Sequence, residues 1–282
     1  MKILVCVNSQ KDKEFVVYDR IASFLKDNGV EYSQCILHKK DSGFDKEDAK
    51  DCNLVIVLGG DGTLMRIAKK AAKYNLPIIG VNTGHLGFLA QTGVDGLEDT
   101  LKRLIAGEYF LEKRMMLKGC VVRNGEIIFE TYALNDVCIN RGGPLQILNY
   151  SVSVNDMLLR SYSADGVIIS TPTGSTGYNL SAGGPIVEPS ADMILLTPIC
   201  AHTFMNRSIL FKANDCVTIT IGEPHDVDTA QRVIASFDGN ERIELLSGDE
   251  VKIVKSDRNI DFIQMNNVNF LETLNRKLKE NQ

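Results

Sequence analysis

The hydrophobic pattern of the chain changes after about Gly107, and this change constrains the fold more than any other feature. Before it, short apolar runs alternate with stretches of helical spacing. After it, strand-like segments follow one another, separated by turn residues. Alternating strands and helices favour a parallel sheet with helices on both faces, whereas successive short strands favour an antiparallel sandwich. We expect a Rossmann-like α/β domain followed by a β-rich, sandwich-like domain.

The elements of the first half can be located from their periodicity. Strands are expected at Lys2–Asn8, Cys35–Leu37, Leu54–Leu58 and Pro77–Val81, and helices at Phe15–Leu25, Leu64–Tyr74 and Leu97–Ile105.

In the second half, Asn124-Gly125 and Asn155-Asp156 have the composition of two-residue hairpin turns. Val268–Lys279 returns to helical spacing and closes the chain. We therefore place residues 1–111 and 267–282 in the α/β domain and residues 112–266 in the β-rich domain.

A glycine-rich turn, Gly59-Gly60-Asp61-Gly62-Thr63, directly follows the strand Leu54–Leu58 and precedes a helix. Glycine allows a ligand to approach the backbone closely, and the N–H groups at a helix start favour an anion such as phosphate. We therefore assign phosphate binding to Gly59, Gly60 and Gly62. At the carboxyl end of a parallel strand, the turn also lies where such sheets bind ligands.

Asp61 is the informative residue of this turn. A carboxylate beside a phosphate is repulsive unless it holds a metal or accepts a proton, and both tasks belong to phosphoryl transfer. The alternative is a tight turn in which Asp61 only caps the helix. Neither G-x-G-x-x-G nor G-x-x-x-x-G-K-[ST] is present, which excludes an ordinary Rossmann dehydrogenase and a Walker-type ATPase. The turn resembles that of NAD kinases, diacylglycerol-type lipid kinases and, approximately, phosphofructokinases.

A second stretch separates these families. Ser163–Gly166 precedes a strand, and Thr171–Tyr178 and Ser181–Pro185 follow it. Taken alone, it could be a surface loop rich in Gly, Ser and Thr. Together with Gly59–Thr63, it resembles the long signature of NAD kinases, which lipid kinases lack. Asn82–Leu89 and Ala133–Asp136 resemble two further motifs of that family, in the same order and at the same spacing, so that the resemblance covers essentially the whole chain.

The resemblance implies the transfer of a phosphate from ATP, with polyphosphate as the alternative donor, to the adenosine-ribose 2′-hydroxyl of NAD, giving NADP. It places Asp61 near that hydroxyl as the general base, with orienting the hydroxyl or holding Mg²⁺ as alternatives. It implies that Asn135 and Asp136 hold the ribose, that Asp165 lies near the nicotinamide, and that Phe88 lines the adenine pocket. The other substrate-binding residues that it implies are Gly62, Thr173, Thr176, Tyr178 and Ser181.

Two positions depart from the family pattern. The family often has Glu where Asp136 stands, which shortens the reach to a ribose hydroxyl by one methylene group. It often has Ala where Gly177 stands, which makes this loop more flexible. Neither departure removes a functional group.

Further expectations concern cofactors and partners. The implied reaction needs ATP and a divalent cation, most simply Mg²⁺, to neutralise the transferring group. No protein metal ligands are assigned. Family members assemble as dimers or tetramers, so a homo-oligomer is expected.

Composition narrows the partners and the compartment. A net charge of −5 argues against nucleic acid as a main partner. The seven scattered cysteines and the lack of a signal sequence or a long apolar run favour a cytoplasmic protein that does not span a membrane. Two other functions stay open: a diacylglycerol-type lipid kinase, and a non-catalytic dinucleotide sensor that keeps the fold.

Overall fold

The computed structural model describes residues 1–38, 43–84, 87–90, 92–143, 147–202, 206–224, 232–265 and 270–280. The chain forms two compact units, residues 1–114 with 258–282 and residues 115–257. The strands β6 (Phe110–Arg123) and β17 (Glu250–Gln264) each run from one unit into the other, so these limits lie within strands.

Unit 1 is built on a parallel sheet in the order β4-β3-β1-β2. The strands are β1 (Lys2–Asn8), β2 (Glu31–Leu37), β3 (Leu54–Leu58) and β4 (Ile78–Asn82). The short β5 (Thr92–Gly93) and the end of β17 pair in parallel with β4. Every residue of β3 and β4 is buried, as in a sheet covered on both faces.

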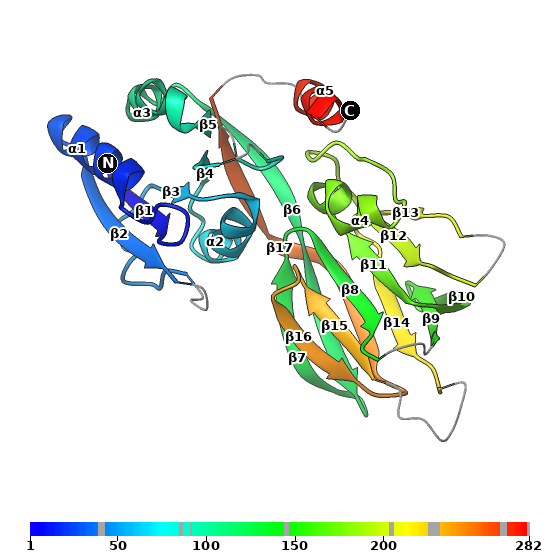
Figure 1. Cartoon of the computed structure of the whole chain (residues 1–282). Helices are drawn as coiled ribbons and strands as arrows, with labels where there is room; N and C mark the ends of the chain where they lie inside the picture. Colours follow the sequence, from blue (N-terminus) through cyan, green and yellow to red (C-terminus); the bar gives the residue numbers. More distant parts are fainter. Residues whose placement is uncertain are drawn as a thin grey trace. The chain divides into compact units, whose positions relative to one another are not determined.

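Helices cover this sheet (Figure 1). Buried side chains of α1 (Val16–Asp27) and α3 (Leu97–Ala106) share one core with alternate residues of β1, β3 and β4. The helix α2 (Asp61–Lys73) contacts β3 and β4 through a separate buried stripe that includes Leu64 and Ile67. A short 3₁₀ turn, η1 (Val94–Gly96), precedes α3, and α5 (Phe270–Glu280) ends the described chain.

Unit 2 consists mainly of antiparallel strands in two sheets. One contains β6, β7, β9, β10, β14 and β17, and the other has the order β13-β12-β11-β8-β15-β16. The remaining elements are β7 (Glu126–Ala133), β8 (Asp136–Arg141), β9 (Leu148–Val154), β10 (Met157–Ala164), β11 (Gly166–Ser170), η2 (Thr173–Thr176), α4 (Tyr178–Ser181), β12 (Met193–Ile199), β13 (Ile209–Lys212), β14 (Val217–Ile221), β15 (Val233–Phe237) and β16 (Glu241–Leu245).

The two sheets of unit 2 share one apolar core. Side chains from β9, β14 and β17 pack in the same cluster as side chains from β8, β11 and β15. This is the sandwich-like arrangement that the second half of the sequence predicts. The two expected hairpin turns are present, with positive φ at both Asn124-Gly125 and Asn155-Asp156, as a type I′ turn requires.

The structure confirms the predicted fold class, and it differs in some boundaries. The predicted start of α2 at Leu64 was three residues late, because the Gly60 carbonyl already accepts from the N–H groups of Thr63 and Leu64. Gly62 therefore belongs to the helix, and only Gly59 and Gly60 form the turn.

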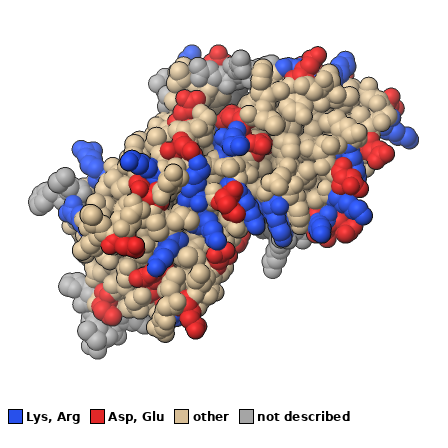
Figure 2. All heavy atoms as spheres, turned by 180° about the vertical axis from the view of Figure 1, so that it is seen from behind, with Lys and Arg blue, Asp and Glu red and all other residues tan. Residues whose placement is uncertain are grey.

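The distribution of surface charge and the character of the helices are relevant to nucleic-acid and membrane partners. On the face drawn in Figure 2, basic and acidic side chains are interspersed. Among the described helices, none has the length and apolar character needed to cross a membrane. All seven cysteines are free thiols.

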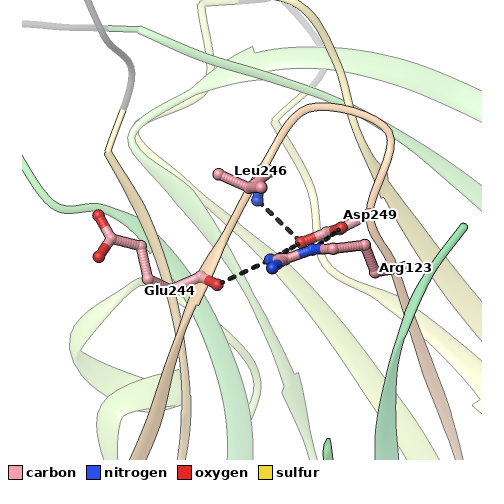
Figure 3. A network of polar contacts seen from close by, with 4 residues as sticks. All are labelled: Arg123, Glu244, Leu246 and Asp249. Atoms are coloured by element: carbon pink, nitrogen blue, oxygen red, sulfur yellow. Dashed lines mark hydrogen bonds and ion pairs between the residues drawn. The ribbon is translucent and has the colours of Figure 1, made fainter. Parts of the chain in front are cut away.

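A polar network ties the β16–β17 turn to β6 (Figure 3). The guanidinium of Arg123 donates to both carboxylate oxygens of Asp249, at 2.8 and 2.7 Å, and to the Glu244 carbonyl at 3.2 Å. The Asp249 carboxylate also accepts from the Leu246 N–H at 2.8 Å. Burial alone would raise the pKa of Asp249, but the hydrogen bonds and charge of Arg123 outweigh it and lower this pKa.

We expect Asp249→Asn to lower the stability of the fold by about 2 kcal/mol at pH 7, because a charge-assisted hydrogen bond is lost. The folded-state pKa of Asp249 lies below its ordinary value of 3.8, so its contribution is present above that value and is lost as the pH falls through the lower one. Denaturation curves should therefore show the difference between the two proteins shrinking in acid. A difference that does not change with pH would contradict the assignment.

Candidate active site

The carboxyl edge of the parallel sheet in unit 1 brings together the glycine-rich turn and two asparagine side chains, at three strand ends. Asn8 ends β1, Gly59 follows β3, and Asn82 ends β4. Asn8 donates from Nδ2 to the Thr63 hydroxyl at 2.8 Å, and the Asn82 side-chain oxygen accepts from the Gly84 N–H at 2.8 Å. This is the edge at which parallel α/β sheets bind their ligands.

The turn between β3 and α2 depends on glycine. Gly59 has a φ of +155°, and a Cβ there would lie 2.8 Å from the Thr63 hydroxyl oxygen. A Cβ at Gly60 or Gly62 would meet open space, so these positions leave room for a ligand. The first N–H groups of a helix have no acceptor within it, so the start of α2 can bind a phosphate. The phosphate-binding role of Gly59, Gly60 and Gly62 stays a prediction.

The Asp61 carboxylate is held by successive backbone N–H groups from the segment that follows β4. Phe88 donates to Oδ2 at 2.8 Å, and Leu89 and Ala90 donate to Oδ1, each at 3.3 Å. A Cβ at Gly87 would overlap the same carboxylate, so only glycine fits there. The orientation of Asp61 is thus set by a distant segment and not by a capping bond to its own helix.

These contacts leave the carboxylate able to accept one more hydrogen bond. An ionised carboxylate has about four acceptor positions, and three are used by amides. The remaining position lies on Oδ2, which has one amide partner. Asp61 is partly exposed, so a ligand hydroxyl can reach it.

Phe88 contributes to this site through its backbone. Its side chain is half-buried, and the predicted contact with adenine stays a prediction. His85 and Leu86, in the middle of the same motif, lie outside the described residues.

In unit 2, the segment Leu134–Asp136 leads from β7 into β8. Its backbone is fixed by the start of the hydroxyl-rich loop, Thr171–Pro185, and by the residue before it. Thr171 donates from its N–H to the Asn135 carbonyl at 2.8 Å and from its hydroxyl to the Leu134 carbonyl at 2.6 Å. Ser170 donates from its hydroxyl to the Asn135 carbonyl at 3.2 Å. A Cβ at Gly174 would overlap that same carbonyl oxygen. The two motifs are therefore one packed unit.

Much of the hydroxyl-rich loop is engaged internally. Ser175 is buried and exchanges hydrogen bonds with the Val187 backbone, at 3.1 and 3.0 Å. Asn179 is fully buried, donating to the carbonyls of Ser175 and Pro185 and accepting from the Thr197 hydroxyl. Thr173 is also buried. This differs from a loop that offers all its hydroxyl groups to a ligand.

Three of the predicted ligand contacts in the loop are at least partly exposed. Tyr178 and Ser181 are exposed, and Thr176 is half-buried. Partial burial, followed by nearby negative groups that include Asp136, raises the pKa of the Tyr178 hydroxyl. The phenol is therefore a neutral hydrogen-bond donor at physiological pH.

Asp165 lies at the opposite end of β11 from Asp136. In the β8–β11 ladder Asp136 pairs with Ser170, whereas Asp165 precedes Gly166, so about 17 Å of strand separates the two positions. The Asp165 carboxylate receives a bidentate pair of hydrogen bonds from Arg141, at 2.7 and 3.3 Å. The separation suits the two ends of a long ligand better than one compact subsite.

Comparison with known proteins identifies the family. The model of the ATP-NAD kinase N-terminal domain matches residues 3–109, and that of the ATP-NAD kinase C-terminal domain matches residues 134–265. The chain belongs to the NAD kinase family. Its activity is therefore that of a phosphotransferase with an alcohol group as acceptor.

Curated relatives and solved structures agree. The chain is 39% identical to the NAD kinase of Lachnospira eligens, covering 97% of this chain and 98% of the relative. It is 38% identical to that of Caldanaerobacter subterraneus subsp. tengcongensis, covering 99% of each. The fold is similar to that of yeast NADH kinase complexed with NADH (TM-score 0.81, 21% identity, covering 99% of this chain and 88% of that one). It is also similar to an NAD kinase from Archaeoglobus fulgidus in complex with ATP (TM-score 0.74, 24% identity, covering 99% of each).

The structure adds residues that the motifs did not assign in this NAD kinase family member. Three of their side chains position the motifs from other elements, and Asn179 does so from within the hydroxyl-rich loop. The residues are Asn8, Arg141, Asn179 and Asp238.

We expect Gly87→Ala to lower NAD kinase activity about 100-fold while the protein stays folded. The added methyl group must displace either Asp61 or the amides that hold it, and a shift of about 1 Å at a reacting group can have this effect. Initial rates of NADP formation and the thermal midpoint measure the two properties. Gly93→Ala is the control, because a Cβ there meets open space; equal activity in both variants would contradict the prediction.

Proposed function

We propose that the chain transfers the terminal phosphate of ATP to the 2′-hydroxyl of the adenosine ribose of NAD, giving NADP. Membership of the NAD kinase family supports the acceptor, and the ATP complex of the Archaeoglobus fulgidus relative supports the donor. The observation that carries the mechanism is the Asp61 carboxylate, held at the start of α2 by successive amides with one acceptor position left.

In this mechanism Asp61 accepts a hydrogen bond from the ribose hydroxyl. As the oxygen attacks the γ-phosphorus and the bond to ADP breaks, the hydroxyl proton passes to the carboxylate, and ADP leaves. The amides that donate to Asp61 fix the direction of its remaining acceptor position on Oδ2, so that the hydroxyl is oriented before the phosphate arrives. The N–H groups at the start of α2, from Gly60 to Gly62, bind phosphate oxygens. The Gly59 N–H already donates to the Val81 carbonyl at 3.1 Å, so Gly59 contributes by its conformation.

The residues fit a divalent cation that arrives with the nucleotide. Within the described part of the chain, no three His, Cys, Asp or Glu side chains are grouped to hold a metal ion. Mg²⁺ usually keeps several waters and binds to substrate phosphates and one or two carboxylates, so it needs no protein cage. When bound, the cation would neutralise charge on the transferring phosphate. Asp61 is the carboxylate of the glycine-rich turn that could contact it.

The NAD-binding roles belong to unit 2. Asn135 and Asp136 bind the ribose hydroxyls, since an amide and a carboxylate together supply donors and acceptors. Thr173, Thr176, Tyr178 and Ser181 contact the adenine, the ribose and the diphosphate, with the exposed Tyr178 hydroxyl as one donor. Asp165 contacts the nicotinamide end, and Phe88 of unit 1 contacts the adenine. The family resemblance supports these assignments.

We expect Asp61→Asn to lower kcat by about 10²- to 10⁴-fold, which is the usual contribution of a general base. The measurement is NADP formation from NAD, ATP and Mg²⁺, read with an NADP-specific dehydrogenase. Asn also changes the bonding to the loop amides, so the loss is compared with that of Gly87→Ala, which disturbs the loop but keeps the carboxylate; the excess loss in Asp61→Asn measures the carboxylate itself. An Asp61→Asn protein with near-normal kcat would remove Asp61 from the mechanism.

The two alternatives left open by the sequence, a lipid kinase and a non-catalytic sensor, disagree with membership of the NAD kinase family, and two further measurements check them directly. Labelled ATP with diacylglycerol micelles in place of NAD tests the lipid kinase. Calorimetric binding of NAD without NADP formation would instead identify a non-catalytic sensor.

We also propose that the chain assembles with copies of itself, as a dimer or tetramer. Supporting this, β10 is an edge strand of its sheet, and Met157 and Leu158 on it are 76% and 63% exposed. Open strand edges with apolar side chains favour pairing with another chain. Light scattering should give a multiple of the monomer mass for the native protein, and Leu158→Lys should reduce it. A monomeric native protein would contradict this proposal.

A further inference from the structure

Asp238 lies in the turn between β15 and β16, with its side chain directed at the segment that joins β7 to β8. Its Oδ2 accepts from the Leu134 N–H at 2.9 Å, and its Oδ1 accepts from the N–H groups of Asn135 and Asp136, at 2.7 and 3.2 Å. Its own N–H donates to the Asp136 carbonyl at 3.0 Å. Asp238 is 8% exposed.

The joining segment needs such a partner. It leaves one sheet at Ala133 and enters the other at Asp136, so at this point its N–H groups cannot all bond within a ladder. Buried N–H groups without acceptors are costly, and successive ones can converge on one anion. The Asp238 carboxylate accepts from three of them. The carbonyls of Leu134 and Asn135 accept hydrogen bonds from Ser170 and Thr171. The backbone of Asn135 is therefore held from both sides.

We infer that Asp238 is a positioning residue for NAD: it fixes the backbone from which Asn135 and Asp136 present their side chains to the adenosine ribose. This inference rests on the proposed ribose role of Asn135 and Asp136. Asp238 itself accepts from backbone amides and acts through them.

The inference depends on Asp238 being a carboxylate. A carboxylate only accepts, whereas an asparagine in its place presents an NH₂ group to at least one of the N–H donors. Asp238→Asn therefore keeps the size of the side chain while forcing one donor away from it. The expected consequence is a displaced ribose-binding segment in a folded protein.

The test compares steady-state kinetics of the full-length variants with NAD and ATP. We expect Asp238→Asn to raise KM for NAD about 10- to 100-fold, by analogy with the loss of a group that orients a metal ligand. KM for ATP should change less than about twofold, because the change affects NAD binding alone. A matched control is Asp249→Asn, which removes another buried carboxylate that accepts from backbone in a neighbouring turn (Figure 3).

The control separates positioning from stability. Asp249→Asn should lower the thermal midpoint as Asp238→Asn does, yet keep the native KM for NAD, since Asp249 bonds Arg123 and Leu246 and not the joining segment. If both variants raise KM for NAD equally, general destabilisation explains the effect and the inference is wrong. If Asp238→Asn does not fold, Asp238→Ser, which keeps one acceptor oxygen, is judged by the same KM criterion.

A third variant distinguishes failure of the inference from failure of the proposed ribose site. Asn135→Ala should raise KM for NAD, and adding Asp238→Asn to it should raise KM by clearly less than in the native background, because the two residues act together. An unchanged KM in Asn135→Ala would count against the ribose site itself. A raised KM in Asn135→Ala with a native KM in Asp238→Asn would overturn only the role of Asp238.

Discussion

The carboxylates of Asp61 and Asp238 each accept hydrogen bonds from three successive backbone N–H groups of a segment distant in sequence. In both cases the donors lie in the connection between two strands or at its end, from β4 to β5 for Asp61 and from β7 to β8 for Asp238. Each carboxylate accepts hydrogen bonds from these amides and thereby orders a segment that neither a helix nor a sheet would hold. The same kind of interaction thus builds one candidate site in unit 1 and another in unit 2.

These contacts are possible because glycine has no Cβ at the points of close approach. A Cβ at Gly87 would occupy the position of the Asp61 carboxylate, and one at Gly174 would meet the Asn135 carbonyl. At Gly59 a Cβ would likewise meet the Thr63 hydroxyl, and the positive φ there also favours glycine. Close approach of backbone to carboxylate or carbonyl, rather than flexibility, therefore accounts for much of the glycine in the motifs.

The hydroxyl-rich loop has a mixed role. Ser170, Thr171 and Ser175 direct their hydroxyl groups to backbone carbonyls, and Asn179 is buried beneath the loop. These side chains hold the loop against β8 and β11, while Tyr178 and Ser181 stay exposed. A motif that looks like a set of ligand contacts is thus largely a support, and the residues free for a ligand are fewer than the pattern suggests.

From local features, the sequence predicts the α/β and β-rich halves, both hairpin turns, the NAD kinase resemblance and a candidate role for Asp61, because periodicity, turn chemistry and motifs depend on residues that are near one another in the chain. It could not assign Asp238, which acts on Leu134–Asp136 about 100 residues away, or show that Arg141 pairs with Asp165. It also could not tell that Ser175 and Asn179 are buried. Only tertiary structure decides which donors and acceptors meet, because hydrogen-bond partners are set by distance in space and not by distance along the chain.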